Sequence, residues 1–138
     1  MNVFRTGVVC SPSHGLACVR RVLDEHGISP LHFQGVRQAE EAFARERFHL
    51  IVCEAQLGDG TYRDVLRTVQ QTGQDALVIV ICPGGEIDIR DYVDAIESGA
   101  LDYLPCACST SDLWWVLRGA LLRLSRQMVE PRVLRQAV

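Results

Sequence analysis

The stretch ALVIVIC, residues 76–82, contains only apolar side chains and is followed by the chain-breaking sequence PGGE. A strand that is apolar on both faces has to be covered on both faces, which is typical of a central strand in a parallel sheet. The run is far shorter than the roughly 20 apolar residues that a membrane helix needs. The stretch therefore predicts a buried central strand and not a transmembrane segment.

Shorter β-rich segments flank this strand, and segments with helical apolar spacing separate them. Strands are predicted at residues 3–10, 31–34, 50–54, 76–82 and 102–105. Helices are predicted between them, where apolar residues recur every three or four positions, as in Leu16, Val19 and Leu23. The alternation of five strands and five helices favours right-handed βαβ crossovers. The predicted fold class is therefore α/β, a (βα)5 three-layer sandwich with helices on both sides of a parallel sheet.

Length and composition are typical of one globular domain. The chain has 138 residues, is 48% hydrophobic and carries a net charge of −3. No stretch is basic enough to indicate direct nucleic-acid binding. The N-terminal sequence MNVFRTGVV lacks the features of a signal peptide, so we expect a cytoplasmic protein without membrane attachment, whose six cysteines are thiols. We expect residues 1–126 to form the domain and residues 127–138 to form a tail or an extension of the last helix.

In sheets of this class a site forms at the carboxyl ends of the strands. The residues at those ends are Cys10 and Ser11 after the first strand, Glu54 after the third, Cys82 after the fourth and Cys106 after the fifth. One carboxylate and three thiols are thus expected to share one pocket. Cys18 and Cys53 are expected to be packing residues, and His14 to be a solvated loop residue.

Three segments resemble, in order and spacing, the receiver domain of bacterial two-component response regulators of the chemotaxis-regulator type. They are LIVCEAQL (50–57), VIVICPGG (78–85) and ESGALDYLPCACSTSDL (97–113). The third segment is the most specific, because the family has Gly-Ala-x-x-Tyr, a Lys-Pro pair and a capped last helix there. The resemblance implies the flavodoxin-like sheet of order 2-1-3-4-5, which agrees with the alternation of elements.

The residues that the family uses for phosphoryl transfer are replaced in this chain. A receiver holds Mg²⁺ with two acidic residues after its first strand and with its phosphoacceptor Asp, where this chain has Cys10, Ser11 and Glu54. Because Mg²⁺ prefers hard oxygen ligands, we expect its binding to be lost and predict no cofactor. Cys82 and Cys106 replace the family's Ser/Thr and Lys, and the chain contains no lysine. The resemblance is thus to a degenerate receiver, or pseudoreceiver, without enzyme activity.

Several roles remain open for this pocket. The Glu54 carboxylate is a candidate mimic of a phosphorylated aspartate, or it is a structural group bound by neighbouring backbone N–H groups. An alternative function is that of a phosphoacceptor, with Glu54 receiving the phosphoryl group in a histidine kinase pathway. A second alternative is a thiol or metal sensor, since Cys10, Cys82 and Cys106 with Glu54 are ligand types that Zn²⁺ accepts. No Cys-x-x-Cys spacing supports this set, so no metal ion is predicted.

The last predicted helix carries a candidate binding surface. If its apolar residues at positions 113, 117, 120 and 124 face the core, Trp115 and Leu122 lie on the outer side with Arg118 between them. In the family, the surface of the fourth helix, fifth strand and fifth helix commonly binds partners or forms the homodimer. Tyr103 is assigned to the same surface, at the position of the family's switch aromatic.

The sequence therefore predicts an atypical receiver domain in bacterial signal transduction. The domain is expected to bind a protein partner or a second copy of itself, independently of phosphorylation. The predicted binding surface is the one formed by the fourth helix, the fifth strand and the fifth helix.

Overall fold

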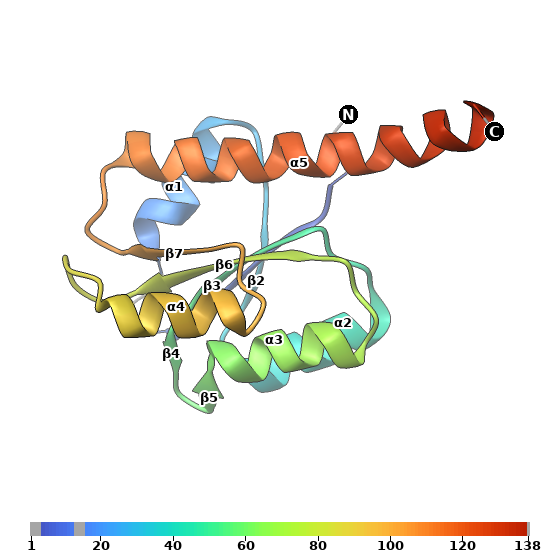
Figure 1. The fold of residues 1–138 in the computed structure, drawn as a ribbon. Helices are drawn as coiled ribbons and strands as arrows, with labels where there is room; N and C mark the ends of the chain where they lie inside the picture. The colour runs from blue at the N-terminus through green and yellow to red at the C-terminus, as the bar shows by residue number, and fades with distance from the viewer. Residues whose placement is uncertain (1–3, 13–15, 138) are drawn as a thin grey trace.

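The computed structural model describes the backbone of residues 4–12 and 16–137, and the side chains of residues 4–12 and 16–127 (Figure 1). His14 therefore lies outside the described residues. The central sheet consists of β1 (Thr6–Val9), β2 (Leu31–Phe33), β3 (Leu50–Glu54), β6 (Leu77–Cys82) and β7 (Asp102–Pro105). Their order is β2-β1-β3-β6-β7, and all neighbouring strands are parallel. The predicted five-stranded sheet of order 2-1-3-4-5 is confirmed, with β6 and β7 as its fourth and fifth strands.

Helices cover both faces of this sheet. They are α1 (Ala17–Glu25), α2 (Val36–Arg45), α3 (Tyr62–Gln71), α4 (Ile89–Glu97) and α5 (Thr110–Ala137). α1 and α5 lie on one side of the sheet, and α2, α3 and α4 lie on the other (Figure 1). The buried apolar residues accordingly form two clusters, one beneath each helix layer.

The strand β6 supplies both layers at once. Its residues 78–82 are all buried. The cluster beneath α2, α3 and α4 contains Val78, Val80 and Cys82, and the cluster beneath α1 and α5 contains Ile79 and Ile81. Successive side chains of a strand point to opposite faces of its sheet, so an entirely apolar strand has to lie in the middle. The prediction made from ALVIVIC is confirmed.

A short antiparallel hairpin follows β3 and is absent from the sequence prediction. It consists of β4 (Gln56–Leu57) and β5 (Gly60–Thr61), joined by the turn at residues 58–59. The hairpin leads directly into α3, whose first turn is closed by a capping box. Thr61 Oγ1 accepts a hydrogen bond from the Arg63 N–H at 3.2 Å, and Asp64 Oδ2 accepts one from the Thr61 N–H at 2.9 Å.

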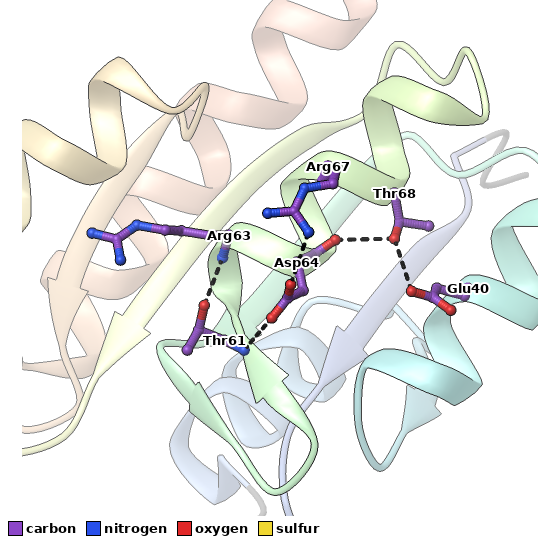
Figure 2. A network of polar contacts seen from close by, with 6 residues as sticks. All are labelled: Glu40, Thr61, Arg63, Asp64, Arg67 and Thr68. Carbon is purple, nitrogen blue, oxygen red and sulfur yellow. Dashed lines mark hydrogen bonds and ion pairs between the residues drawn. The ribbon is translucent and has the colours of Figure 1, made fainter.

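The same region joins α3 to its neighbour α2 (Figure 2). Arg67 forms an ion pair with Asp64 at 3.2 Å, one turn further along α3. The Thr68 hydroxyl lies 3.0 Å from the backbone oxygen of Asp64 and 3.5 Å from Glu40 Oε1 on α2. These contacts hold α3, and with it the end of the hairpin, against α2.

The turn of the hairpin also caps a second helix. The Asp59 carboxylate accepts hydrogen bonds from the backbone N–H groups of Val36 and Arg37, at 2.8 and 3.0 Å, at the start of α2. The residue before α2 is Gly35, which has no side chain of its own to cap the helix. A Cβ at Gly35 would lie 2.5 Å from Asp59 Oδ1, so a larger residue at this position would displace the capping carboxylate. Asp59 thus replaces a local N-cap from a distant turn.

The helix α5 begins beside β7 and runs to Ala137, extending beyond the sheet (Figure 1). Ser109 Oγ accepts a hydrogen bond from the Asp112 N–H at 3.0 Å and so caps the helix start. No helix in the described part of the chain combines the length and the apolar character needed to cross a membrane.

Candidate functional site

A small cavity lies at the carboxyl ends of the central strands, where the sequence predicts a site. Its volume is about 200 Å³, and its walls include Leu16, Cys18, Glu54, Ile81, Cys82 and Cys106. Three of the five predicted pocket residues are therefore brought together: Glu54, Cys82 and Cys106. Two larger and more open hollows, of about 510 and 490 Å³, lie around Ser29 at the opposite end of the sheet, and none of the predicted residues lines them.

Glu54 is the last residue of β3, and its side chain is bound to the end of β1. Glu54 is 8% exposed. Its Oε1 accepts hydrogen bonds from the Ser11 backbone N–H at 2.7 Å and from the Ser11 hydroxyl at 3.1 Å. Because β1 and β3 are parallel neighbours, their carboxyl ends adjoin, and this places Ser11 within reach. The structure thus contains the backbone N–H contact that the sequence leaves open as one role for Glu54.

Cys10 does not line the cavity. It is 8% exposed and belongs to the apolar cluster beneath α1 and α5. Cys10 continues the alternation of β1, in which Val9 faces the opposite layer. Burial raises the pKa of the Cys10 thiol, and the charge of Glu54 raises it further, while Arg20 acts in the opposite direction. The residues that line the cavity do not include Cys10, contrary to the prediction that it shares the pocket.

The residues present at the carboxyl ends do not fit a magnesium ion. Among Cys10, Ser11 and Glu54, only Glu54 has a carboxylate, and Ser11 already occupies one of its oxygens. Mg²⁺ requires a nearly octahedral set of oxygen ligands. The softer set of Cys10, Cys82 and Cys106 with Glu54 is not assembled either, since Cys10 lies in the core. Among the described residues, no group of three or more His, Cys, Asp or Glu side chains is arranged to hold a metal ion.

Cys82 connects the cavity to Tyr103 on the neighbouring strand. Burial raises the pKa of the Cys82 thiol, and a hydrogen bond from Tyr103 acts in the opposite direction. Burial also raises the pKa of Tyr103. The charge of the Cys82 thiolate and the hydrogen bond to Cys82 raise it further. The Tyr103 ring packs edge-to-face on Tyr62 with centroids 6.2 Å apart. Tyr103 is 6% exposed, so it lies beneath the predicted binding surface and not on it.

Cys106 and Cys18 form the outer wall of the cavity. The Cys106 thiol lies 3.7 Å from the backbone oxygen of Gly84, and the Cys18 thiol lies 3.8 Å from the backbone oxygen of Cys106. The sequence analysis expects Cys18 to be a packing residue. It does not predict that Cys18 contributes to the cavity wall. α1 begins at Ala17, directly beside the strand ends, a position that apolar spacing alone does not reveal.

A second region of interest consists of exposed apolar side chains on the two helices that flank β7. Eight large hydrophobic side chains are exposed in the described part of the chain, and seven of them belong to α4, to the loop before α4 or to α5. They are Ile87, Ile89, Tyr92, Val93, Ile96, Trp115 and Leu122. Since β7 is the edge strand, α4 on one side of the sheet and α5 on the other border the same edge. We call these seven residues the α4–β7–α5 face.

The outer side of α5 is as predicted. Trp115 is 71% exposed and Leu122 is 44% exposed, whereas Leu113 and Leu117 are buried. The Arg118 guanidinium lies over the Trp115 ring, 5.9 Å from its centroid. The orientation of these side chains is thus confirmed, and their role in binding stays a prediction.

Sequence comparison finds that the chain is similar to bacterial regulatory proteins. It is 32% identical over 112 residues to the alginate biosynthesis transcriptional regulatory protein AlgB of Pseudomonas putida. The matched region covers 81% of this chain and 25% of AlgB. It is 32% identical over 71 residues to the response regulator protein PilR of Pseudomonas aeruginosa, which covers 51% of this chain and 16% of PilR. The chain thus spans a quarter or less of the length of these relatives. No family model matches the chain.

Solved structures share the whole fold. The beryllofluoride-activated NtrC4 receiver domain dimer is similar with a TM-score of 0.76 and 24% identity, over 87% of this chain and 98% of that one. This chain has the receiver-domain fold of response regulators. A response regulator receiver domain protein from Clostridium thermocellum has the same receiver fold, with a TM-score of 0.74 and 19% identity over 88% of this chain and 96% of that one. The cavity lies where the resemblance to receivers implies a phosphoacceptor pocket.

Proposed function

We propose that this receiver-type domain acts in bacterial cytoplasmic signal transduction as a protein-interaction module whose binding does not depend on phosphorylation. The observation that carries the proposal is the α4–β7–α5 face. It gathers seven of the eight exposed large hydrophobic side chains in the described residues. Exposed apolar patches on a soluble domain mark interaction sites.

The chemistry of the cavity supports independence from phosphorylation. Transfer of a phosphoryl group needs positive charge near the oxygens on which negative charge develops. None of the described residues that line the cavity carries a positive charge. A phosphoryl group on Glu54 would meet thiols and apolar walls, and Glu54 Oε1 is already bound by Ser11. The alternative is that Glu54 is a phosphoacceptor that receives its phosphoryl group from a histidine kinase. Glu54 would then have to react without a positively charged residue in the described cavity wall.

The composition of the face supports a protein partner. Burying one large apolar side chain contributes roughly 1.5–3 kcal/mol, so several such residues on α4 and α5 suffice to drive association. Trp and Arg are the residue types most enriched among those that dominate interface energies. Trp115, with Arg118 over its ring, is therefore the expected centre of the interface.

The charges beside these apolar residues favour a second copy of the chain as the partner. The helix α4 carries three carboxylates and one arginine: Arg90, Asp91, Asp94 and Glu97. The described part of α5 carries three arginines and one carboxylate: Asp112, Arg118, Arg123 and Arg126. In a two-fold dimer, α4 of one copy can face α5 of the other, which brings opposite charges together around the apolar residues. The NtrC4 receiver, which shares the fold, is itself a dimer.

Sedimentation analysis over a wide concentration range tests this proposal. We expect the wild type to form a dimer, and Val93→Asp to abolish it because a charge enters the apolar contact. Trp115→Ala should weaken the dimer by ~30-fold, since the loss of such a residue costs about 2 kcal/mol.

Leu31→Asp is the matched control. Leu31 is 46% exposed and lies on β2 at the opposite edge of the sheet. This variant should dimerise like the wild type. A wild type that stays monomeric, or a Leu31→Asp variant as disrupted as Val93→Asp, would contradict the assignment of this face to a second copy.

A further inference from the structure

We propose that Cys18 and Cys106 form a redox-sensitive thiol pair, in which a hydroperoxide drives formation of a disulfide that links α1 to the loop between β7 and α5. The inference concerns the cavity and is independent of what binds the α4–β7–α5 face. It replaces the sensor set considered from the sequence, which includes Cys10 and omits Cys18.

Cys18 and Cys106 line the same cavity, although they belong to elements that are far apart in the chain. Cys18 lies in the first turn of α1, and Cys106 directly follows β7. The Cys18 thiol lies 3.8 Å from the backbone oxygen of Cys106, and both side chains line the same cavity. A disulfide requires the two Cα atoms to approach within about 7 Å, with both side chains directed at one space. Cys18 and Cys106 meet the second of these conditions, because both side chains line one cavity.

Access separates this pair from the three buried cysteines. Cys106 is exposed and Cys18 is half-buried, whereas Cys10, Cys53 and Cys82 are buried. Burial raises the pKa of each of these three thiols and so keeps them protonated. Peroxide reacts with the thiolate form of an accessible cysteine. Cys106 is therefore the residue that meets the oxidant first.

The reaction balances with one hydroperoxide. The Cys106 thiolate attacks one oxygen of hydrogen peroxide, the O–O bond breaks, and the hydroxide that leaves takes up one proton to become water. The product is a sulfenic acid on Cys106. The Cys18 thiol then attacks this sulfur, the S–S bond forms, and the sulfenic oxygen leaves as a second water. The two thiols together lose two electrons, which reduce hydrogen peroxide to two molecules of water.

Cys108 is the nearest competitor for Cys18. Its side chain packs against the same apolar cluster as Cys18, beneath α1 and α5. Burial raises the pKa of the Cys108 thiol, and the neighbouring Cys18 raises it further. We assign the bond to Cys106 because it shares the cavity wall with Cys18 and is exposed, whereas Cys108 is half-buried. Cys108 thus provides a control two residues away.

The disulfide would act on the segment that leads into the binding surface. α5 begins at Thr110, only four residues after Cys106, and carries Trp115 in its second turn. A covalent link from α1 to this segment would restrict the start of α5 relative to the sheet. It would give the domain an input at the cavity that does not require Glu54 to be phosphorylated.

The test uses the full chain treated with hydrogen peroxide, followed by alkylation of the remaining thiols and intact mass spectrometry. The untreated protein should take up six alkyl groups under denaturing conditions. The oxidised wild type should take up four, and a thiol reductant should restore six. Cys18→Ala and Cys106→Ser should not form the link, whereas Cys108→Ser should form it at the wild-type rate. Circular dichroism of each variant, recorded before treatment, establishes that it is folded.

Three outcomes would overturn the assignment. The first is a wild type that keeps six alkylatable thiols, or that gains only oxygen atoms. The second is a Cys106→Ser variant that still forms an intramolecular link, which would identify Cys108 as the partner. The third is a link that joins two chains, which the doubled mass of the oxidised species would reveal.

Discussion

The cavity at the strand ends and the α4–β7–α5 face differ in how their side chains are engaged. At the carboxyl ends of the strands, polar groups are engaged in structure: Ser11 binds Glu54, and Asp59 caps α2. At the α4–β7–α5 face, apolar groups remain exposed, with Ile89 at 73% and Trp115 at 71%. The polar groups at the strand ends thus hold one another in place, whereas the apolar groups of the face are open to solvent.

The contrast shows that a scaffold and its chemistry are separable. The sheet order and the position of the cavity match receivers, although positions used for phosphoryl transfer in the family hold Cys10, Cys82 and Cys106. The buried apolar strands determine the sheet order by their packing. The fold therefore persists when the residues at the strand ends are replaced.

The largest effect is expected from two isoleucines that differ only in their surroundings. Ile79 is fully buried on β6, and Ile89 is 73% exposed on α4. Ile79→Ala should lower the free energy of unfolding by about 2–5 kcal/mol, because it leaves a cavity in the core. Ile89→Ala should change it by less than about 0.5 kcal/mol and weaken the dimer instead. Urea denaturation of both variants, with sedimentation of Ile89→Ala, checks this; an Ile89→Ala variant that is as destabilised as Ile79→Ala would show that Ile89 belongs to the core.

The second effect concerns how α4 is attached. Only Ala95 of α4 is buried, and the Asp94 carboxylate accepts a hydrogen bond from the Tyr62 hydroxyl at 2.8 Å and pairs with Arg63. Asp94→Asn removes the charge from both contacts, so the amides of α4 should exchange about fivefold faster, for a loss of about 1 kcal/mol at this partly exposed site. Hydrogen exchange by mass spectrometry measures this. Asp91→Asn on the same helix is the control, and equal acceleration in both variants would remove the special role of Asp94.

The third effect tests whether the turn at the cavity end is structural. Asp59→Ala should destabilise the domain by about 1 kcal/mol at neutral pH through the loss of the α2 cap. The Arg37 and Val36 N–H groups lower the pKa of Asp59 in the folded chain. Its contribution is therefore fully present above the ordinary Asp pKa of about 3.9 and is lost as the pH falls through the lower folded-state value.

Thermal unfolding over a pH series checks the behaviour of Asp59. The difference between Asp59→Ala and the wild type should shrink below about pH 4 and vanish in stronger acid. Asp75→Ala, in an exposed loop, should match the wild type throughout. A difference for Asp59→Ala that does not depend on pH would mean that its charge does not stabilise α2.

The smallest effect is expected at the anchor of Glu54. Ser11→Ala removes the hydroxyl contact at 3.1 Å and keeps the backbone N–H contact at 2.7 Å. The loss of one of the two described hydrogen bonds between Ser11 and Glu54 should lower stability by about 0.5 kcal/mol. It should leave the dimer unchanged, because the cavity and the face are expected to act separately. Calorimetry and sedimentation of this variant measure the two quantities. A weaker dimer would show that the two regions are coupled.

The fold could be predicted because its signals are local and repeated. The apolar run at residues 76–82 specifies a central strand, and the apolar spacing of α5 correctly placed Trp115 and Leu122 outside. The hairpin of β4 and β5 escaped prediction because strands of two residues have no periodicity.

The site was predicted less completely because it depends on tertiary placement. Residue type and order identified Glu54, Cys82 and Cys106, but not that Cys10 points into the core or that Cys18 reaches the cavity from α1. The same limit applies to α4, where Val93 and Ile96 have the spacing of a core face and remain exposed. Spacing identifies an apolar side of a helix and does not show what covers it.

Native mass spectrometry with and without acetyl phosphate and Mg²⁺ tests the central claim most directly, because one spectrum reports both phosphorylation and assembly. We expect a dimer of unmodified chains in both conditions, in the same proportion. A phosphate-sized mass gain that disappears in Glu54→Gln, accompanied by a shift between monomer and dimer, would contradict the account and restore Glu54 as a phosphoacceptor.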